Sequence, residues 1–333
     1  MYNLSDKTIL ITGGTGSLAN ALIPRFLALG VRSVRLLSRG EHAQEEMHRR
    51  LIGVEDRLRF FIGDVRDQER VMTATVGCDV VIHAAALKIV PACAYNPWEA
   101  ELTNIQGTKN VSAACFFNQV DRAVFISTDK AVEPVTLYGC TKAAAESLWL
   151  HANNMKGWRD TLFSAVRYGN VVGSKGSVLP LFLKQRKTGK LSVTDKNMTR
   201  FWLSMNGAVD CVIRAITDTR GGEVFVKQAP TMSIMALVAA IAPDCEVVEI
   251  GRRAQEKLSE VLVTYEEARR TLEDKEGGYY IIEPEEPMWG RTITNDYSLV
   301  PEGFRYTSHK NPWRVNREDY IADALEYERL HHE

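Results

Sequence analysis

The sequence predicts an α/β protein with a doubly wound parallel sheet, followed by a smaller C-terminal α/β region that binds the substrate. Two observations predict this class: short apolar runs alternate with helical segments over residues 1–170, and the alternation weakens beyond them. Strands that are separated by helices pair in parallel and are covered on both faces, which explains their continuous apolar character. The chain has 333 residues, of which 45% are hydrophobic, so it can bury a large core.

The composition is that of an ordinary globular protein. A net charge of -1 gives no global electrostatic reason to bind nucleic acid or an anionic membrane, and we predict neither partner. The six cysteines are scattered without C-x-x-C or metal-ligand spacing, which predicts small core residues in a reducing compartment and no metal site. No apolar run approaches the roughly 20 residues of a membrane span, and the N-terminus leads into a strand rather than a signal peptide. We therefore expect a cytoplasmic protein.

The first apolar run, residues 7–12, predicts a strand that leads directly into the glycine-rich run 13–19 and a helix. This order is typical of the dinucleotide-binding turn of a Rossmann sheet. Gly13 allows the bend, Gly16 lets the backbone approach the pyrophosphate, and the small Ala19 lets the helix pack closely. The contacts expected at this turn are Gly13, Thr15, Gly16, Ser17 and Leu18.

The helix after this turn is predicted to stop at Gly30, and a second strand covers residues 34–37. The end of that strand selects the cofactor, because an acidic residue there holds the ribose hydroxyl of NAD, whereas arginine accepts the phosphate of NADP. Here the chain has Ser38 and Arg39, which predicts NADP with these two residues at its phosphate. In the alternative interpretation, Arg39 is a solvated surface residue and Glu41 takes the ribose.

Two further strands, 59–62 and 79–83, bring more cofactor contacts to the same edge of the sheet. The first is followed by a carboxylate and an apolar residue that we expect to flank the adenine, and the second by small alanines that let the cofactor lie across it. Asn104, at the start of the next helix, is expected either to brace the backbone or to cap that helix. The contacts expected here are Asp64, Val65, Ala84, Ala85, Ala86, Lys88 and Asn104.

The run 122–127 predicts a buried strand and 137–153 a helix, so residues 128–130 emerge where ligands of open α/β sheets gather. Tyr138 and Lys142 are one helical turn apart and project from one face of that helix. An ammonium beside a phenol lowers the tyrosine pKa toward neutrality, which suits an acid or base in carbonyl–alcohol chemistry. This spacing also arises by chance in many helices, but its setting favours the functional interpretation.

After a strand at 163–168, the glycine- and serine-rich run 169–178 is predicted to line a pocket. The charged segments 194–202 and 250–263 are expected to cover the substrate, and a helix is predicted to start within 256–263. The predicted cofactor-binding part comprises residues 1–170 and about 204–240, and the nucleotide-sugar-binding part comprises 171–203 and about 241–333.

Several motifs together resemble those of the extended short-chain dehydrogenase/reductase superfamily: residues 12–16, the Tyr138/Lys142 pair and residues 167–170. A closer similarity, from about residue 7 to about residue 265, is to the soluble, inverting UDP-N-acetylglucosamine 4,6-dehydratases. Related dTDP-glucose dehydratases carry Glu where Lys130 stands. The stretches that carry the closer similarity are 83–88, 127–132 and 198–202.

The resemblance implies a dehydration in three steps with NADP as the cofactor. Tyr138, kept ionisable by Lys142, takes the hydroxyl proton at carbon 4 of the hexose as hydride passes to NADP. Lys130 then removes the proton at carbon 5, and protonated Asp129 gives its proton to the departing hydroxyl at carbon 6, to which the hydride returns. Lys130 must be neutral and Asp129 protonated, and Lys88 is expected to depress the Lys130 pKa by like-charge repulsion.

For the nucleotide sugar, the resemblance implies contacts from Lys88, Thr128, Asn170, Val178, Thr199, Arg200, Arg253 and Glu256. Arginine donates in pairs to a diphosphate, and a carboxylate suits ribose hydroxyls. The chain departs from the family at Arg253-Ala254-Gln255-Glu256, where relatives have Arg-Pro-Gly-Glu, and this leaves the nucleobase and the carbon-2 substituent open.

Two alternatives remain. A 4-epimerase uses the Tyr138/Lys142 pair but has no use for Asp129 and Lys130, and a catalytically silent nucleotide-sugar-binding protein keeps only the fold. Because relatives assemble, we also expect a homo-oligomer.

Overall fold

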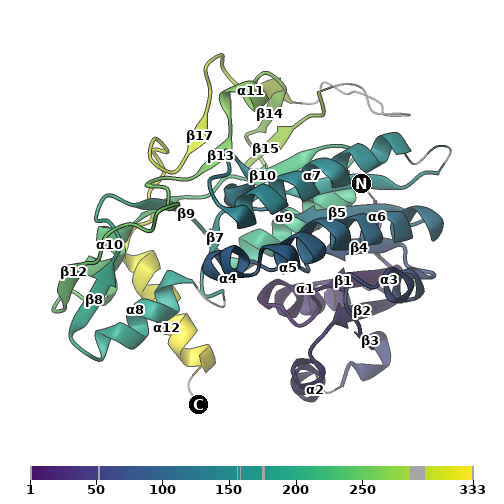
Figure 1. Ribbon diagram of the computed structural model, residues 1–333, viewed down its shortest axis with the longest axis horizontal. Coiled ribbons are helices and arrows are strands. Elements are labelled where there is room, and N and C mark those ends of the chain that lie inside the picture. The colour runs from purple at the N-terminus through teal and green to yellow at the C-terminus, as the bar shows by residue number, and fades with distance from the viewer. Residues whose placement is uncertain are drawn as a thin grey trace.

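The computed structural model describes residues 2–51, 53–155, 157, 159–174, 177–285 and 297–331. Within them, the largest element is a ten-stranded sheet with the order β16-β14-β15-β10-β6-β5-β4-β1-β2-β3 (Figure 1). The strands from β3 to β10 are parallel, and β15, β14 and β16 add to one side in antiparallel register. The bounds are β1 Thr8–Thr12, β2 Ser33–Ser38, β3 Leu58–Ile62, β4 Val80–His83, β5 Arg122–Ile126, β6 Leu162–Val166, β10 Val224–Lys227, β14 Thr271–Asp274, β15 Tyr279–Ile282 and β16 Ser298–Leu299.

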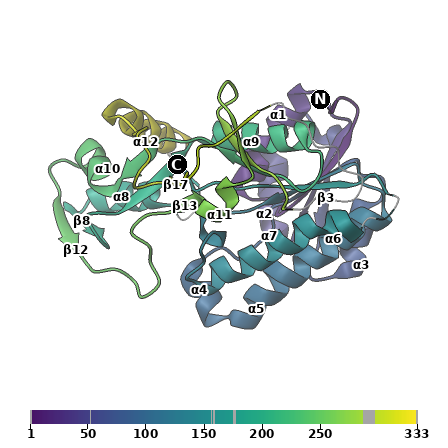
Figure 2. The same ribbon diagram turned by 90° about the horizontal axis from the view of Figure 1, so that it is seen from above.

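Helices cover both faces of this sheet, which confirms the predicted doubly wound class (Figure 2). One face packs against α3, α6 and α7 in a core that includes Trp149 and Phe125, and the other packs against α1, α2 and α9 around Ile11 and Phe26. The bounds are α1 Ser17–Ala28, α2 Glu41–Arg50, α3 Gln68–Thr75, α6 Gly107–Phe117, α7 Leu137–Met155 and α9 Met205–Asp218. Shorter helical segments are η1 Glu55–Arg57, α4 Val90–Tyr95, α5 Pro97–Glu101, the π-helical η2 Leu102–Gln106 and η3 Asp129–Ala131.

The predicted smaller C-terminal α/β region is also present, on the left of Figure 1. It has a separate hydrophobic core, in which Phe182, Leu237 and Tyr320 pack together. Its helices are α8 Val178–Arg186, α10 Ile234–Ile241 and α12 Arg317–His331, and α11 Tyr265–Ala268 lies apart from them. Its strands are β7 Asn170–Val171, β8 Lys190–Val193, β9 Thr199–Leu203, β11 Thr231–Ser233, β12 Glu246–Glu249, β13 Val261–Val263 and β17 Tyr306–Thr307.

Two expectations about local structure are wrong. No helix starts within residues 256–263, because Val261–Val263 forms β13 and pairs with β17. The cysteines are free, but Cys140 is exposed and Cys245 is half-buried, so only four of the six are core residues. The division of the chain into cofactor-binding and sugar-binding parts remains a prediction.

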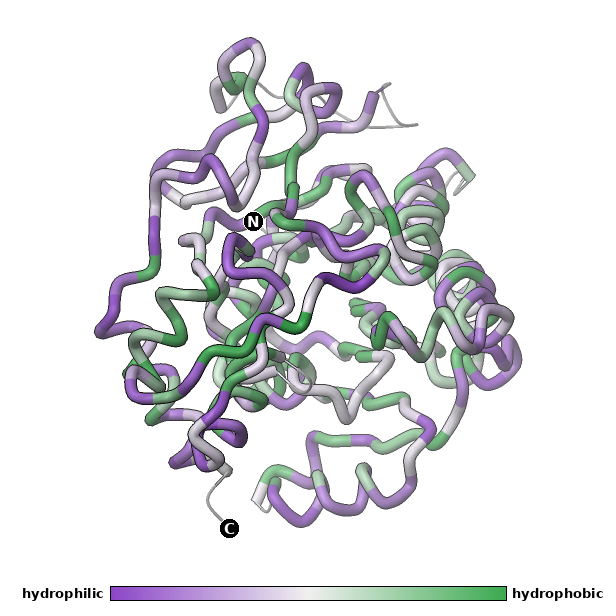
Figure 3. The backbone as a smooth tube through the Cα atoms, turned by 60° about the vertical axis from the view of Figure 1, so that its left-hand side comes forward, coloured by the Kyte–Doolittle hydropathy of each residue, from purple (hydrophilic) through white to green (hydrophobic). Residues whose placement is uncertain are grey.

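The parallel strands place all their carboxyl ends at one edge of the sheet. Hydrophobic segments run through the middle of the molecule and hydrophilic ones predominate on its outer loops (Figure 3). The polar residues that follow β1, β2, β3, β4 and β5 are therefore brought together, as is usual for ligand sites in open α/β sheets.

Candidate active site

The turn between β1 and α1 lies tightly against the neighbouring strands. Gly13 has a φ of +71°, and a Cβ at this position would lie 3.0 Å from the backbone of Ala84 and Ala85. A Cβ on Gly14 would lie 2.8 Å from Leu36 on β2. The glycines are thus required both by backbone conformation and by space, and the turn presents its amides at the carboxyl edge of the sheet.

The ends of β2 and β3 carry a cluster of opposite charges. An Arg39 guanidinium nitrogen lies 3.8 Å from Asp64 Oδ2, and Arg66 pairs with the same carboxylate at 2.6 Å. Burial would raise the Asp64 pKa, but the hydrogen bonds and charge of Arg66 outweigh it and lower the pKa below its ordinary value. The Ser38 hydroxyl accepts a hydrogen bond from Gln44. The structure therefore brings Ser38, Arg39 and Asp64 to one edge.

Asn104 resolves the alternative left open by the sequence, because it braces the backbone after β4. Its Oδ1 accepts a hydrogen bond from the Leu87 N–H at 2.9 Å, and its Nδ2 donates to the Leu87 carbonyl and to Thr141 at 3.0 Å each. It does not cap α6, whose N-cap is Gln106. Lys88, next along the chain, is exposed.

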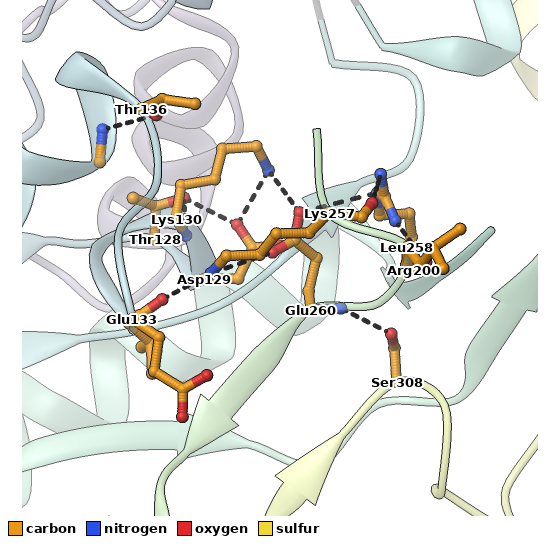
Figure 4. Close-up of polar contacts among 12 residues, drawn as sticks. Thr128, Asp129, Lys130, Glu133, Thr136, Arg200, Lys257, Leu258, Glu260 and Ser308 are labelled. Atoms are coloured by element: carbon orange, nitrogen blue, oxygen red, sulfur yellow. Dashed lines mark hydrogen bonds and ion pairs between the residues drawn. The ribbon is translucent and has the colours of Figure 1, made fainter. Parts of the chain in front are cut away.

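Thr128, Asp129 and Lys130 follow the end of β5 (Figure 4), where Asp129 and Lys130 lie on the short helix η3 and Thr128 is its N-cap. Asp129 is fully buried, and its Oδ1 accepts hydrogen bonds from the Thr128 hydroxyl at 2.9 Å and from the Lys130 ammonium at 3.0 Å. Its Oδ2 is buried with no hydrogen-bond partner. One oxygen of this carboxyl therefore has two hydrogen-bond donors, whereas the other is buried without one. This is unusual, because buried polar atoms normally have hydrogen-bond partners.

Tyr138 and Lys142 lie in the first turns of α7 and are both buried. A Cβ on Gly139 would lie 2.3 Å from the Lys130 carbonyl oxygen, so the glycine lets the helix begin directly against η3. The Thr128 side chain is close enough to the Tyr138 phenol to lower its pKa. Lys142 Nζ donates to the Ile126 carbonyl at 2.7 Å.

The ionisation of this pair differs from the expectation. Burial raises the pKa of Tyr138 to about 12, and the cation that partly opposes this rise is Lys130 rather than Lys142. Burial also lowers the pKa of Lys142 to about 7, against the stabilising charge of Glu146. The prediction that the pair itself lowers the tyrosine pKa is therefore wrong, because both groups are desolvated together.

Glu260 completes the cluster, although it precedes β13 far along the chain. Its side chain is 4% exposed, and its Oε1 lies 3.7 Å from both Lys130 Nζ and Arg200 Nε. Lys257 Nζ lies 3.9 Å from the other oxygen and donates to the Val132 carbonyl at 2.7 Å (Figure 4). Burial and the charge of Asp129 raise the Glu260 pKa, and these three cations oppose the rise.

The Lys130 pKa is raised rather than depressed. Burial lowers it, but Asp129 and Glu260 outweigh burial, and the main like charge that opposes them is Arg200. The expectation that Lys88 supplies the repulsion is wrong, since Lys88 is exposed and is not among the main influences. The cluster holds Lys130 as an ammonium until one of its two carboxylates gains a proton.

The residues expected on the nucleotide sugar form two groups. Arg200 lies beside the catalytic cluster and donates to the carbonyls of Thr199, Lys257 and Leu258, so it holds the 257–260 segment. Asn170 and Val178 lie on β7 and at the start of α8, respectively. Arg253 is exposed, and its N–H donates to Glu256 at 3.3 Å, away from the Asp129 cluster.

A cavity of about 660 Å³ lies elsewhere, at the amino-terminal end of the parallel strands. It shares no residue with the cluster just described; its lining includes Tyr2, Arg122, Arg214, Arg220 and Glu223.

The family model described as polysaccharide biosynthesis protein matches residues 9–283, which is most of the chain. The chain belongs to this family. A UDP-N-acetylglucosamine 4,6-dehydratase (inverting) of Campylobacter jejuni is 42% identical over 331 residues, covering 96% of this chain and 97% of that protein. A UDP-glucose 4-epimerase of Rickettsia akari is 40% identical over 345 residues, with 96% and 98% covered.

Solved structures of the family and its superfamily share the fold. The structure of Pen from Bacillus thuringiensis superposes with a TM-score of 0.89 at 34% identity, covering 98% of this chain and 99% of that one. A dTDP-glucose 4,6-dehydratase of Streptomyces venezuelae, at 19% identity, has a TM-score of 0.71 with 97% of each chain covered. Membership of the extended short-chain dehydrogenase/reductase superfamily is thereby confirmed.

Two residues of the cluster around Lys130 were missed from the sequence. Glu260 and Lys257 both lie in the stretch 253–260 that was compared with the relatives, but attention fell on Arg253 and Glu256. The signal was the second glutamate of that stretch, which directly precedes a buried strand, where an unpaired carboxylate is costly.

Proposed function

We propose that the protein is a nucleotide-sugar 4,6-dehydratase that acts on UDP-N-acetylglucosamine and inverts carbon 5. The observation that supports this most is the Asp129–Lys130 pair, hydrogen-bonded at 3.0 Å next to Tyr138. Dehydration needs one group to remove the carbon-5 proton and another to protonate the carbon-6 hydroxyl, in addition to the group that serves carbon 4. The site supplies all three side chains within one cluster.

Each side chain has a role that its position supports. Tyr138 accepts the proton of the carbon-4 hydroxyl, Lys130 removes the carbon-5 proton, and Asp129 protonates the departing hydroxyl. Lys142 orients the start of α7 through its hydrogen bond to the Ile126 carbonyl. Arg200 and Arg253 bind the diphosphate, with Asn170, Val178, Thr199 and Glu256 as further contacts of the nucleotide sugar.

The residues at the carboxyl edge fit a dinucleotide. The positive φ of Gly13 and the small Ala84–Ala86 stretch leave the backbone accessible, and Asp64 carries a hydrogen-bonded carboxylate. We propose NADP rather than NAD, because Ser38 and Arg39 stand where an acidic residue would hold the NAD ribose. Bound at this edge, with Thr15, Gly16, Ser17, Leu18, Val65, Lys88 and Asn104 as further contacts, NADP supplies a hydride acceptor and donor.

A 4-epimerase is the second candidate, because relatives carrying that name are 40% identical to this chain. Epimerisation leaves the mass of the nucleotide sugar unchanged, whereas dehydration removes one water. Mass spectrometry of UDP-N-acetylglucosamine, UDP-glucose and dTDP-glucose after incubation with the purified protein therefore distinguishes the two. We expect loss of water from UDP-N-acetylglucosamine; a mass-neutral product would support the epimerase, and no product with any sugar would support a silent binding protein.

We further propose that the protein is a homo-oligomer. Large apolar side chains are exposed on neighbouring helices: Tyr95 is 87% exposed, Trp98 78% and Leu148 52%. Exposed apolar patches commonly mark protein interfaces.

No helix of the described residues is long and apolar enough to cross a membrane. A reducing, cytoplasmic setting remains a prediction from the free cysteines.

A further inference from the structure

The loop that joins the two halves of the candidate active site contains an unusual backbone conformation. Residues 132–136 connect η3, the element of Lys130, with α7, the element of Tyr138. Within this loop, Glu133 has a φ of +46°. A residue with a Cβ is uncommon in this left-handed region, and it persists there only where the surrounding structure holds it. Contacts that hold Glu133 are therefore of interest for the geometry of the site.

Two cationic side chains from a distant part of the chain hold this loop at its left-handed residue. Arg305, which directly precedes β17, donates from Nη2 to both carboxylate oxygens of Glu133, at 2.6 Å each. Lys257 donates to the carbonyl oxygen of Val132 at 2.7 Å (Figure 4). The Arg305 guanidinium also lies over the ring of Tyr265, 5.3 Å from its centroid. Glu133 is thus held by its side chain and by the peptide bond that precedes it.

The Glu133 side chain takes no direct part in the chemistry. It points away from the Lys130 ammonium (Figure 4), and 47% of it is exposed. A half-exposed ion pair contributes little to the stability of the whole fold, because water screens it and both side chains lose freedom. The effect of this pair is therefore expected on the geometry of the loop rather than on global stability.

The far end of the loop is closely packed, so a change at Glu133 cannot be absorbed there. Thr136 Oγ1 accepts a hydrogen bond from the Gly139 N–H at 3.0 Å and so holds the start of α7. A Cβ on Gly139 would lie 2.3 Å from the Lys130 carbonyl oxygen and 3.1 Å from Pro134 Cβ, which shows how tightly α7 and η3 meet. A different backbone conformation at Glu133 would therefore move η3 relative to α7.

We propose that Glu133 is a positioning residue whose left-handed backbone is held by Arg305 and Lys257. It sets the distance between Tyr138, which serves carbon 4, and Lys130, which serves carbon 5. The inference rests on the proposed dehydratase function, in which both groups must reach one bound hexose. Because a displacement of about 1 Å can slow a reaction about 100-fold, a small change in this loop separates oxidation from dehydration.

The first test removes the ion pair with Arg305→Ala and follows single turnovers. Oxidation is measured by the absorbance of reduced nicotinamide and dehydration by mass spectrometry. Trp149 anchors α7 in the main core, so η3 is the element that moves. We expect dehydration to slow about 10-fold to 100-fold and oxidation to change much less, so that reduced nicotinamide and the 4-keto sugar accumulate. KM and the urea midpoint should stay unchanged, as all four quantities should in Arg269→Ala, which removes another exposed ion pair.

The second test separates the ion pair from the backbone conformation. Glu133→Ala and Glu133→Gly both remove the carboxylate, but only glycine adopts a positive φ without steric cost. We expect Glu133→Ala to behave like Arg305→Ala and Glu133→Gly to retain most of the dehydration rate. Equal rates in the two Glu133 variants would overturn the proposal, and so would a variant that slows oxidation and dehydration equally, because a purely structural role predicts that result.

A third measurement needs no substrate. Amide hydrogen exchange of residues 131–139 is compared between the wild type and Arg305→Ala, and we expect faster exchange in this segment alone. Unchanged exchange would overturn the hold of Arg305 on the loop. If the wild type removes no water from any nucleotide sugar, the proposed function fails even where exchange shows that the loop is held. Water loss with unchanged exchange removes the positioning role alone.

Discussion

The carboxylate of Glu260 lies 3.7 Å from the ammonium of Lys130, which also donates a hydrogen bond to Asp129 at 3.0 Å. Lys130 therefore contacts two carboxylates that come from different parts of the chain. Both raise its pKa, although the proposed reaction needs the neutral amine. Glu260 thus raises the pKa of Lys130, the proposed base, although no contact between Glu260 and the sugar is proposed.

Glu260→Gln should lower the Lys130 pKa, because it removes one of the two carboxylates that raise it. A base acts in its deprotonated form, so the rising limb of the pH profile for carbon-5 proton removal should move to lower pH by about one unit. Deuterium incorporation at carbon 5 in heavy water measures this step. Glu266→Gln, at a glutamate that is 78% exposed on α11, is the matched control, and a shift to higher pH would contradict the assignment.

Lys130→Ala should abolish deuterium uptake at carbon 5 while oxidation at carbon 4 continues. The reason is that the amine acts after the ketone forms, so its loss leaves the first step intact. Rapid-quench analysis with isotope-ratio mass spectrometry can measure both steps. Uptake that persists in this variant would remove Lys130 from the role of base.

Gly139→Ala should destabilise the protein by about 2 kcal/mol and reduce dehydration more than NADP binding. Its Cβ would lie 2.3 Å from the Lys130 carbonyl, so either α7 or the catalytic residues on η3 must move. Chemical denaturation and cofactor titration give the two quantities. Gly40→Ala, whose Cβ meets only Ala43 at 3.6 Å, should change neither, and equal effects of the two substitutions would show that the contact is unimportant.

The buried Lys142 should make stability depend on pH. Its folded pKa of about 7 lies below the ordinary lysine value, so between these pKa values the unfolded chain binds more protons, and the free energy of unfolding rises with pH. Relative to Lys142→Met, the wild type should gain stability by a slope of about 1 kcal/mol per pH unit from pH 7 to pH 10. Urea denaturation measures this, with exposed Lys184→Met as the control; a slope of opposite sign would contradict the burial of a neutral amine.

Arg39→Ala should weaken NADP binding about 10-fold to 100-fold, since a charge-assisted contact to the phosphate is lost. Binding of NAD, which has no such phosphate, should change little. Isothermal titration with both cofactors tests this, with the exposed Arg49→Ala on α2 as the control. Unchanged binding of both cofactors would favour the alternative in which Arg39 is a solvated surface residue and Glu41 takes the ribose.

The parallel sheet could be predicted because its signals are local. The strands from β1 to β6 consist mainly of apolar residues, and each is followed by residues whose chemistry suits a ligand. The proposed catalytic residues Asp129, Lys130, Tyr138 and Lys142 lie close together in the sequence, so one strand and one helix were enough to place them. The parallel pairing of these strands followed from the alternation of strands and helices.

The remainder depends on contacts between distant segments. Residues 256–263 have an apolar pattern that a helix could also show, but the Glu260 N–H donates to Ser308 and β13 pairs with β17, and both partners come later in the chain. The pKa values of Tyr138 and Lys142 were misjudged for a related reason. Their spacing shows that they are neighbours, whereas burial by the surrounding elements decides which of them is charged.

Arg167, which follows β6, is buried between Glu146 on α7 and Glu267 on α11. The arginine and its first partner are made early in translation, and the second partner, like Glu260, is made much later. A nascent chain on the ribosome can therefore contain the glycine-rich turn after β1, and Tyr138, before the segment that carries Glu260 has been synthesised. The cluster around Lys130 is therefore expected to be complete only after the segment that carries Glu260 and Glu267 has been synthesised.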